Sequence, residues 1–297
     1  MKYFVFSFFL LISCTDSGKI LPGATGESSE LIFVVDDYLW KNSIDSLSSS
    51  IFGSTIKGVI PEEPLFRIIQ VNNSEFKSVL KRHKNVIIVA KGVNKSFQKN
   101  KWSIGQFVAQ INWDGDPQKL LNEFIKLRNL FTAKEVKSLR SSFEILSQKK
   151  GEKILLSNFG VECVVPQEYH IIKNDSTLFW ANYNSSKSDE IKNILIFSFI
   201  PKIKKSKEEI LIKVDSIFKQ HLVGQKEGSY ARIEKRYTPY YFDNTYRGLW
   251  KLEKGFMGGP FIVKTYFITN KTVVNIGMVF APQKSKRKYI KEFEAIL

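Results

Sequence analysis

Short apolar runs and helically spaced apolar residues alternate through the first half of the chain. Four runs have the length and the β-branched content of buried strands. These runs are Glu30–Val35, Leu65–Val71, Val86–Ala90 and Gln106–Trp113. After the first run, Asp36 or Asp37 can cap a helix whose apolar residues recur every three or four positions from Trp40 to Ile51. A short helix is also predicted at Ser74–Lys81, so this half has an α/β pattern.

Two consecutive amphipathic helices are predicted after residue 113. Asp116 can be an N-cap with Pro117 in the first helical turn, and the apolar stripe that follows extends to Phe131. Thr132 and Glu135 then match a capping box, in which two side chains satisfy the free N–H groups of a helix start. The pattern therefore predicts a second helix that begins there and continues to Leu146.

The second half of the chain is richer in strand patterns, with polar turns between them. The predicted strands are Val161–Val165, Tyr169–Ile172, Leu178–Tyr183, Ile194–Ile200, Tyr230–Tyr237, Arg247–Leu252, Pro260–Thr269 and Thr272–Phe280. Ser206 and Glu209 match a capping box for a helix that Gly224 ends, and a closing helix is predicted at Lys284–Leu297. Because strands outnumber helices, we expect an α+β fold with mostly antiparallel sheets, helices packed on their faces, and two α/β halves.

The first residues have the layout of an export signal that ends at a cysteine. The apolar run Tyr3–Ile12 covers about 15 Å as a helix, half of the roughly 30 Å hydrocarbon core, so it cannot span a membrane. Lys2 precedes the run, and residues 11–14 resemble a bacterial lipobox. We expect residues 1–13 to be removed as a signal peptide and Cys14 to carry lipid. The alternative is a short N-terminal helix with an incidental cysteine.

The rest of the chain has the composition of a folded body behind a tether. Residues 14–29 are rich in Gly, Ser and Thr and are expected to form the lipidated tether. The body is expected to divide into an N-terminal α/β half, 30–150, and a C-terminal antiparallel α+β half, 160–297. Lipidation of Cys14 would leave Cys163 alone between valines, so we expect a buried thiol and no intrachain disulfide.

The formal net charge of +16 does not by itself indicate a nucleic-acid partner. Only eight of the 45 basic residues are Arg, and guanidinium groups make most of the bidentate contacts with phosphates and bases. The basic residues are also scattered along the chain. We therefore expect no nucleic-acid partner, and a surface close to anionic lipid headgroups fits the charge better.

Several segments have the character of family signatures. They are LPGATGESSELIFVVDD (21–37), EEPLF (62–66), VPQEYHI (165–171), STLFWANY (176–183), YRGLWKLEKGFMGGPF (246–261) and VFAPQKSKRKYIKEFEAIL (279–297). Together they resemble a Bacteroidota lipoprotein family known as domain of unknown function 4837, over nearly the whole chain after Cys14. The resemblance implies an exported, lipid-anchored protein and implies no particular activity.

GFMGGPF, residues 255–261, is the most unusual string in the chain. Its glycines permit close backbone approach, and Pro260 is tolerated at the start or edge of a strand. One interpretation is a tight turn that leads into a strand. The other is a ligand or partner contact, because an Arg beside aromatic residues suits anionic or glycan ligands. The candidate contact residues are Tyr246, Arg247, Trp250, Gly258 and Gly259.

Four cations crowd the N-terminal end of the closing helix. They are Lys284, Lys286, Arg287 and Lys288. The helix dipole disfavours cations at this end by about 0.3–1 kcal/mol each. Either exposed side chains tolerate that cost, or the four residues contact an anionic surface such as lipid headgroups or an acidic partner.

These patterns indicate where the protein acts more clearly than what it does. His83, His170 and His221 are not spaced as a local metal pair, and no hydrolase or nucleotide-binding motif stands in its required context. We expect no metal, cofactor or catalytic residue. The favoured function is a non-catalytic binding or scaffolding lipoprotein of the cell envelope, at the outer membrane, with an envelope protein or glycan partner. The alternative is an envelope enzyme that acts on a glycan or lipid substrate.

Overall fold

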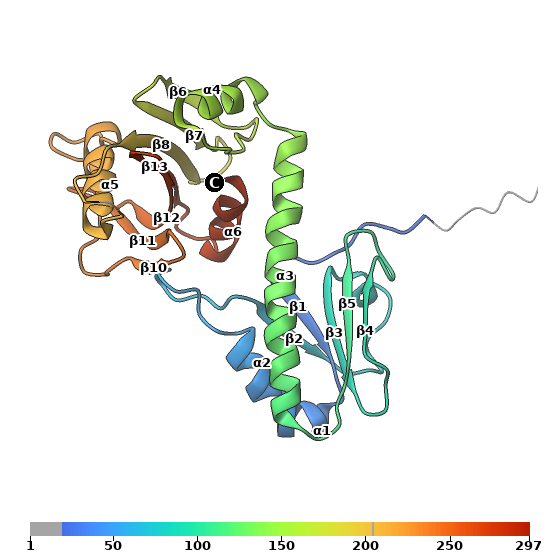
Figure 1. Ribbon diagram of the computed structural model, residues 1–297. Coiled ribbons are helices and arrows are strands. Elements are labelled where there is room, and N and C mark those ends of the chain that lie inside the picture. The colour runs from blue at the N-terminus through green and yellow to red at the C-terminus, as the bar shows by residue number, and fades with distance from the viewer. Residues whose placement is uncertain (1–19, 204) are drawn as a thin grey trace, which may run out of the picture.

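A computed structural model describes residues 20–203 and 205–297, so Cys14 and the expected signal peptide lie outside the described residues. In this part of the chain the strands form one five-stranded and one eight-stranded sheet. The long helix α3 (Pro117–Ile145) stands between the two sheets (Figure 1). The predicted α+β class is confirmed.

The five-stranded sheet belongs to the first half of the chain and has the order β2-β1-β3-β5-β4. Its pairs β1–β2, β1–β3 and β3–β5 are parallel, and β4 runs antiparallel to β5. The strands are β1 (Glu30–Val34), β2 (Arg67–Val71), β3 (Asn85–Ala90), β4 (Ser96–Lys99) and β5 (Phe107–Asn112). Such parallel pairs require crossover connections, and one of these carries the helical segments between β1 and β2.

That crossover packs an aromatic core against the sheet. It contains α1 (Asp37–Leu39), one π-helical segment (Trp40–Ile44) and α2 (Asp45–Ile51). Of the two predicted cap candidates, Asp36 is the N-cap, because its carboxylate accepts the N–H groups of Tyr38 and Leu39. The Phe33 ring lies 5.5 Å from the rings of both Phe52 and Phe124, so β1, α2 and α3 share one core.

The eight-stranded sheet is antiparallel throughout and has the order β10-β11-β12-β13-β8-β7-β6, with β9 beside β11. Its strands are β6 (His170–Asn174), β7 (Leu178–Asn184), β8 (Ile191–Phe199), β9 (Ala231–Ile233), β10 (Tyr240–Phe242), β11 (Thr245–Leu252), β12 (Gly258–Ile268) and β13 (Lys271–Phe280). Helix α5 (Lys207–His221) covers one face. Helices α4 (Lys149–Phe159) and α6 (Lys286–Ile296) cover the other, so two separate apolar cores sandwich the sheet.

Helix α3 corrects the prediction of two consecutive helices. Asp116 caps it as expected, but the helix continues without a break through Thr132 and Glu135. The buried positions Leu120, Phe124, Leu127, Phe131 and Glu135 keep one helical phase. Because packing of this stripe holds the helix continuous, the N–H groups near Thr132 are already bonded within the helix. A capping box has no free N–H group to satisfy at this point.

Other predicted elements are wrong or shorter. The short helix at Ser74–Lys81 is absent: this segment forms turns that lead into a single 3₁₀ turn at Leu80–Arg82. Val161–Val165 is not a strand, although the N–H of Val164 donates to the carbonyl of Ile296 in α6. The predicted Tyr230–Tyr237 strand is reduced to β9. Helix α4 and the short strands β4 and β10 were not predicted, because they lack a long apolar repeat.

The segment expected to be a tether is part of the folded first half from residue 22 onward. The N–H of Ala24 donates to the carbonyl of Ile104, and the N–H of Thr25 donates to the carbonyl of Arg82, both at 2.9 Å. Ser29 is fully buried. The free part of any tether therefore ends before this segment.

The two halves contact each other along α3 and α6. Glu135 of α3 and Lys291 of α6 form an ion pair in which both residues are buried. Glu135 also accepts the N–H of Ser29 and the side-chain amide of Asn85, each at 2.9 Å. A second contact is the loop of residues 53–66, which extends from the first half to the second (Figure 1). Its residues Ile56 and Val59 pack against Ile290 of α6.

Candidate functional site

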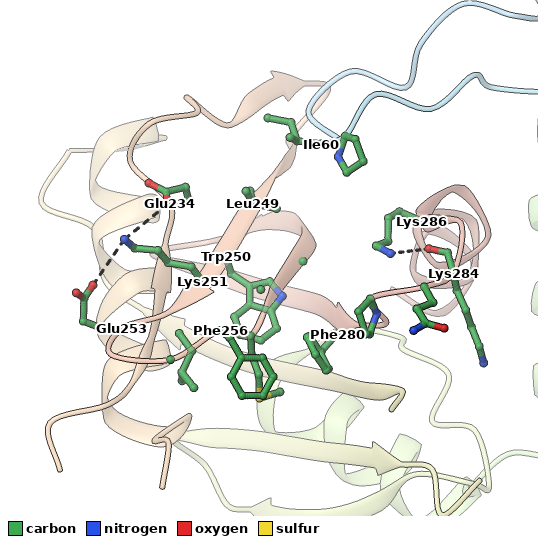
Figure 2. Close-up of a pocket in the computed structure, with 18 of the residues that line it drawn as sticks. Ile60, Glu234, Leu249, Trp250, Lys251, Glu253, Phe256, Phe280, Lys284 and Lys286 are labelled. Carbon is green, nitrogen blue, oxygen red and sulfur yellow. Dashed lines mark hydrogen bonds and ion pairs between the residues drawn. The ribbon is translucent and has the colours of Figure 1, made fainter. Parts of the chain in front are cut away.

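A groove of about 1010 Å³ lies where the 53–66 loop meets the second sheet. The loop contributes Ile60, Pro61 and Glu63. The other walls come from the ends of β11 and β12, the turn that joins them, and the segment from Phe280 to the first residue of α6, Lys286. Lys226, Glu234 and Arg236 also line the groove. Figure 2 shows apolar side chains at the centre of this groove and charged side chains at both sides. Both halves of the chain therefore build the site.

Trp250 of β11 lies at the centre of the groove (Figure 2). It is only 4% exposed, and its indole Nε1–H donates to the carbonyl oxygen of Val279 at 3.1 Å. Gly259 is paired with Trp250 in the sheet register. A Cβ at Gly259 would collide with the Val279 carbonyl oxygen and would lie 3.5 Å from the indole nitrogen. Gly259 therefore leaves room for the Val279 carbonyl that accepts the indole hydrogen bond, which is a structural role for part of GFMGGPF.

The turn between β11 and β12 carries a solvent-exposed aromatic ring. Phe256 is 92% exposed, although its ring centroid lies 6.5 Å from that of Phe280 in an edge-on arrangement. Both rings line the groove, as do Met257 and Leu249. Phe256 and the apolar side chains beside it together form an apolar surface within the groove, and contiguous apolar surface of this kind can hold a ligand or partner.

One wall of the groove is a chain of ion pairs. The Lys251 ammonium lies 3.6 Å from Glu234 and 3.9 Å from Glu253 (Figure 2). Arg236 donates to Glu234 through its side chain at 2.9 Å and through its backbone N–H at 3.1 Å. The Arg236 contacts, together with Lys251, lower the pKa of Glu234 to about 2. Arg232 lies 3.4 Å from Glu253, so both carboxylates of this wall are already paired.

On the opposite side, Glu63 caps α6. Its carboxylate accepts the N–H of Lys286 at 2.6 Å, the N–H of Arg287 at 3.0 Å and the hydroxyl of Ser285. Burial opposes ionisation of Glu63, but these hydrogen bonds keep its pKa below the usual value. An acidic residue of the same chain thus compensates the cations predicted at this helix start.

The four cations at the start of α6 have separate partners. The Lys284 ammonium lies 2.9 Å from Glu190, and Lys288 lies 3.6 Å from Glu292. Arg287 donates to the carbonyl of Pro64 at 2.9 Å. Lys286 is buried and donates to the carbonyls of Ala281 and Lys284, and burial lowers its pKa. The Lys286 side chain therefore lies inside the protein, whereas the Lys288 side chain is exposed to solvent.

The structure separates the five residues singled out around GFMGGPF. Trp250, Gly258 and Gly259 line the groove, but Tyr246 and Arg247 do not. Tyr246 is buried in the core, with its ring 4.8 Å from that of Tyr241. Arg247 points to the other face of β11 and forms a 2.5 Å ion pair with Glu294 of α6.

The alternation of side chains along a strand already predicts that Arg247 and Trp250 lie on opposite faces. Side chains at odd spacing on a strand point to opposite faces, so residues 247 and 250 cannot share a site on one face. Three further groove residues, Phe256, Glu63 and Glu234, are not among the candidates that the sequence predicts. The string GFMGGPF points to Phe256, but no local pattern connects Glu63 or Glu234 with residues that lie far away in the sequence.

The described residues contain neither a metal-binding cluster nor a reactive thiol. Within residues 20–203 and 205–297, no group of three His, Cys, Asp or Glu side chains is placed to hold a metal ion. Cys163 is buried, and burial raises the pKa of its thiol to about 12. Over the same residues, no helix is both long and apolar enough to cross a membrane.

Family models match both halves of the chain. A domain of unknown function, DUF4837, matches residues 147–297, and a second domain of unknown function, DUF8532, matches residues 24–144. The chain therefore belongs to the DUF4837 family, and the match to that model covers the second half. The resemblance of residues 21–37 and 62–66 to DUF4837 was too wide, because those segments fall in or largely in the DUF8532 match. No curated protein matches the chain.

Proposed function

We propose that this chain is a Bacteroidota lipoprotein of the cell envelope that binds a ligand or partner in its groove without converting it. The lipobox-like residues 11–14 and the short apolar run before them support export and lipidation at Cys14. The lipid would hold the folded body at a membrane, with the outer membrane favoured. Its partner would be an envelope component, either a protein or a glycan.

One observation carries the binding role. The groove combines an exposed Phe256 and a Trp250 floor with carboxylates that are already engaged. Glu63 accepts three hydrogen bonds at the start of α6, and Glu234 is paired with Arg236 and Lys251. A general base needs a carboxylate available to the substrate. These carboxylates favour binding over the alternative of an envelope enzyme that acts on a glycan or lipid.

Lipidation is tested by metabolic labelling with an alkyne analogue of palmitate. We expect the unmodified protein to be labelled and recovered with membranes, and Cys14→Ala to be neither labelled nor processed. Cys163→Ala is the matched control and should behave like the unmodified protein, because that thiol is buried. Labelling that persists in Cys14→Ala would disprove the proposed anchor.

The binding role is tested by crosslinking in cells. A photoreactive benzoyl-phenylalanine at position 256 should form an adduct with an envelope component. The same group at position 145, where Ile145 is 80% exposed at the end of α3, is the control and should form none. Absence of an adduct at position 256 would contradict a binding role for the groove.

A further inference from the structure

The chemistry of the groove indicates which class of ligand it would hold. We propose that the groove binds an anionic amphiphile, a molecule with a phosphate-type head and an apolar chain such as an acidic phospholipid. This inference rests on the proposed binding function and specifies its ligand. It combines three features of the groove: its charge balance, its apolar surface and its size.

The charge balance favours an anionic ligand. In the described part of the chain six cations and three carboxylates line the groove. The cations are Lys226, Arg236, Lys251, Lys254, Lys284 and Lys286. Glu63 and Glu234 accept hydrogen bonds from within the protein, and Glu253 is ion-paired with Arg232. Most of the cations are engaged as well: Arg236 and Lys251 pair with Glu234, Lys284 pairs with Glu190, and Lys286 is buried. The donors that a ligand can reach are therefore chiefly the exposed Lys226 and Lys254. A sugar presents hydroxyl donors that need acceptors, whereas a phosphate presents acceptors alone.

Two exposed cations lie near the exposed aromatic ring of the groove. Lys254 and Phe256 belong to the same turn, and both are exposed. The Lys254 ammonium donates to the carbonyl of Glu227 at 3.3 Å, which places it beside the turn that carries the exposed Lys226. The apolar floor of Trp250, Met257 and Phe280 continues from Phe256. A head group held by Lys226 and Lys254 would therefore place an attached chain over this floor.

The size of the groove agrees with a ligand larger than a free head group. Small-molecule sites usually enclose about 300–1,000 Å³. The volume of about 1010 Å³ is at the upper end of that range, and its walls come from both halves of the chain. A phosphate or glycerol phosphate would fill only part of this space and would leave Phe256 exposed.

Isothermal titration calorimetry with short-chain lipids below their micelle concentration tests the proposal. The protein is the full chain with Cys14→Ser, so that its own lipid cannot enter the groove. We expect dihexanoyl-phosphatidylglycerol to bind about tenfold more tightly than dihexanoyl-phosphatidylcholine, whose choline cation cancels the phosphate charge and is repelled by the lysines of the groove. Binding should also be about tenfold tighter than that of glycerol 3-phosphate, which has no acyl chains to contact the apolar floor.

Two exposed positions separate the contributions of chain and head group. Phe256→Ser should weaken binding of both lipids about tenfold, because it removes apolar contact area. Lys254→Gln should weaken the phosphatidylglycerol complex and reduce its advantage over phosphatidylcholine. The matched controls are Ile145→Ser and Lys77→Gln, which are exposed outside the groove and should leave both affinities unchanged.

Three results would overturn the proposal. They are equal affinity for the two lipids, no effect of Phe256→Ser, and tighter Phe256-dependent binding of an oligoglutamate peptide, which would indicate an acidic protein partner. If neither lipid binds but crosslinking at position 256 still captures an envelope component, the proposed ligand class is wrong and the binding function stands. If both experiments fail, the binding function fails as well.

Discussion

The buried carboxylate of Glu135 has its partners far away in the sequence. Glu135 matches a local capping box with Thr132, yet its carboxylate contacts Ser29, Asn85 and Lys291. Inside a continuous helix the backbone N–H groups are already bonded, so a capping side chain has nothing to satisfy there. The partner of such a residue is set by what packs against the helix.

The ionised form of Glu234 should stabilise the fold. Its pKa is about 2 in the folded protein, against an ordinary value of 4.5. Its stabilising contribution is therefore complete above pH 4.5 and lost as the pH falls toward 2. Glu234→Gln should lower the urea midpoint at pH 7, and the difference from the unmodified protein should shrink between pH 4.5 and 2. A constant difference over this range would show that the Glu234 charge has no such role.

At the scale of elements, the periodic patterns locate the long strands and amphipathic helices. Strands β8, β11, β12 and β13 and helix α5 lie where the sequence predicts them. The pattern does not reveal which distant residues cap the ends of these elements. The start of α6 is the clearest case, since its cap is Glu63 from the other half of the chain.

Removal of the α6 cap should destabilise the protein. Glu63→Ala leaves the N–H groups of Lys286 and Arg287 without their acceptor, and loss of an N-cap costs about 0.5–2 kcal/mol. We expect a loss near the upper end, because these hydrogen bonds involve a charged carboxylate. Chemical denaturation measures it, with the neighbouring exposed residue in Glu62→Ala as the control. Equal stability of the two variants would contradict the capping role.

At the scale of the whole molecule, the two halves share buried polar contacts as well as apolar ones. Lys291 is 1% exposed and stacks over the Phe66 ring at 4.2 Å, in addition to its ion pair with Glu135. Burial lowers the pKa of Lys291, and the Glu135 charge opposes that change. A buried pair of this kind depends on both partners being present.

Glu135→Ala should be strongly destabilising, by about 3–5 kcal/mol, because it leaves a buried ammonium without its partner. The double variant Glu135→Ala with Lys291→Met should lose no more stability than Glu135→Ala alone, since the unpaired charge is then absent. Urea unfolding measures both. Glu144→Ala removes an exposed ion pair with Arg140 on the same helix and should cost at most about 1 kcal/mol. Additive losses in the double variant would contradict this coupling.

Local sequence patterns are enough to predict the α+β class, most of the long elements and the family of the second half. These depend on local periodicity and on residue signatures, which are complete in a stretch of neighbouring residues. Tertiary packing makes α3 continuous and brings Glu63 to the start of α6. The groove is of the same kind, because its walls come from segments about 200 residues apart in the chain. Contacts at such separations arise from packing between the halves, which local patterns do not encode.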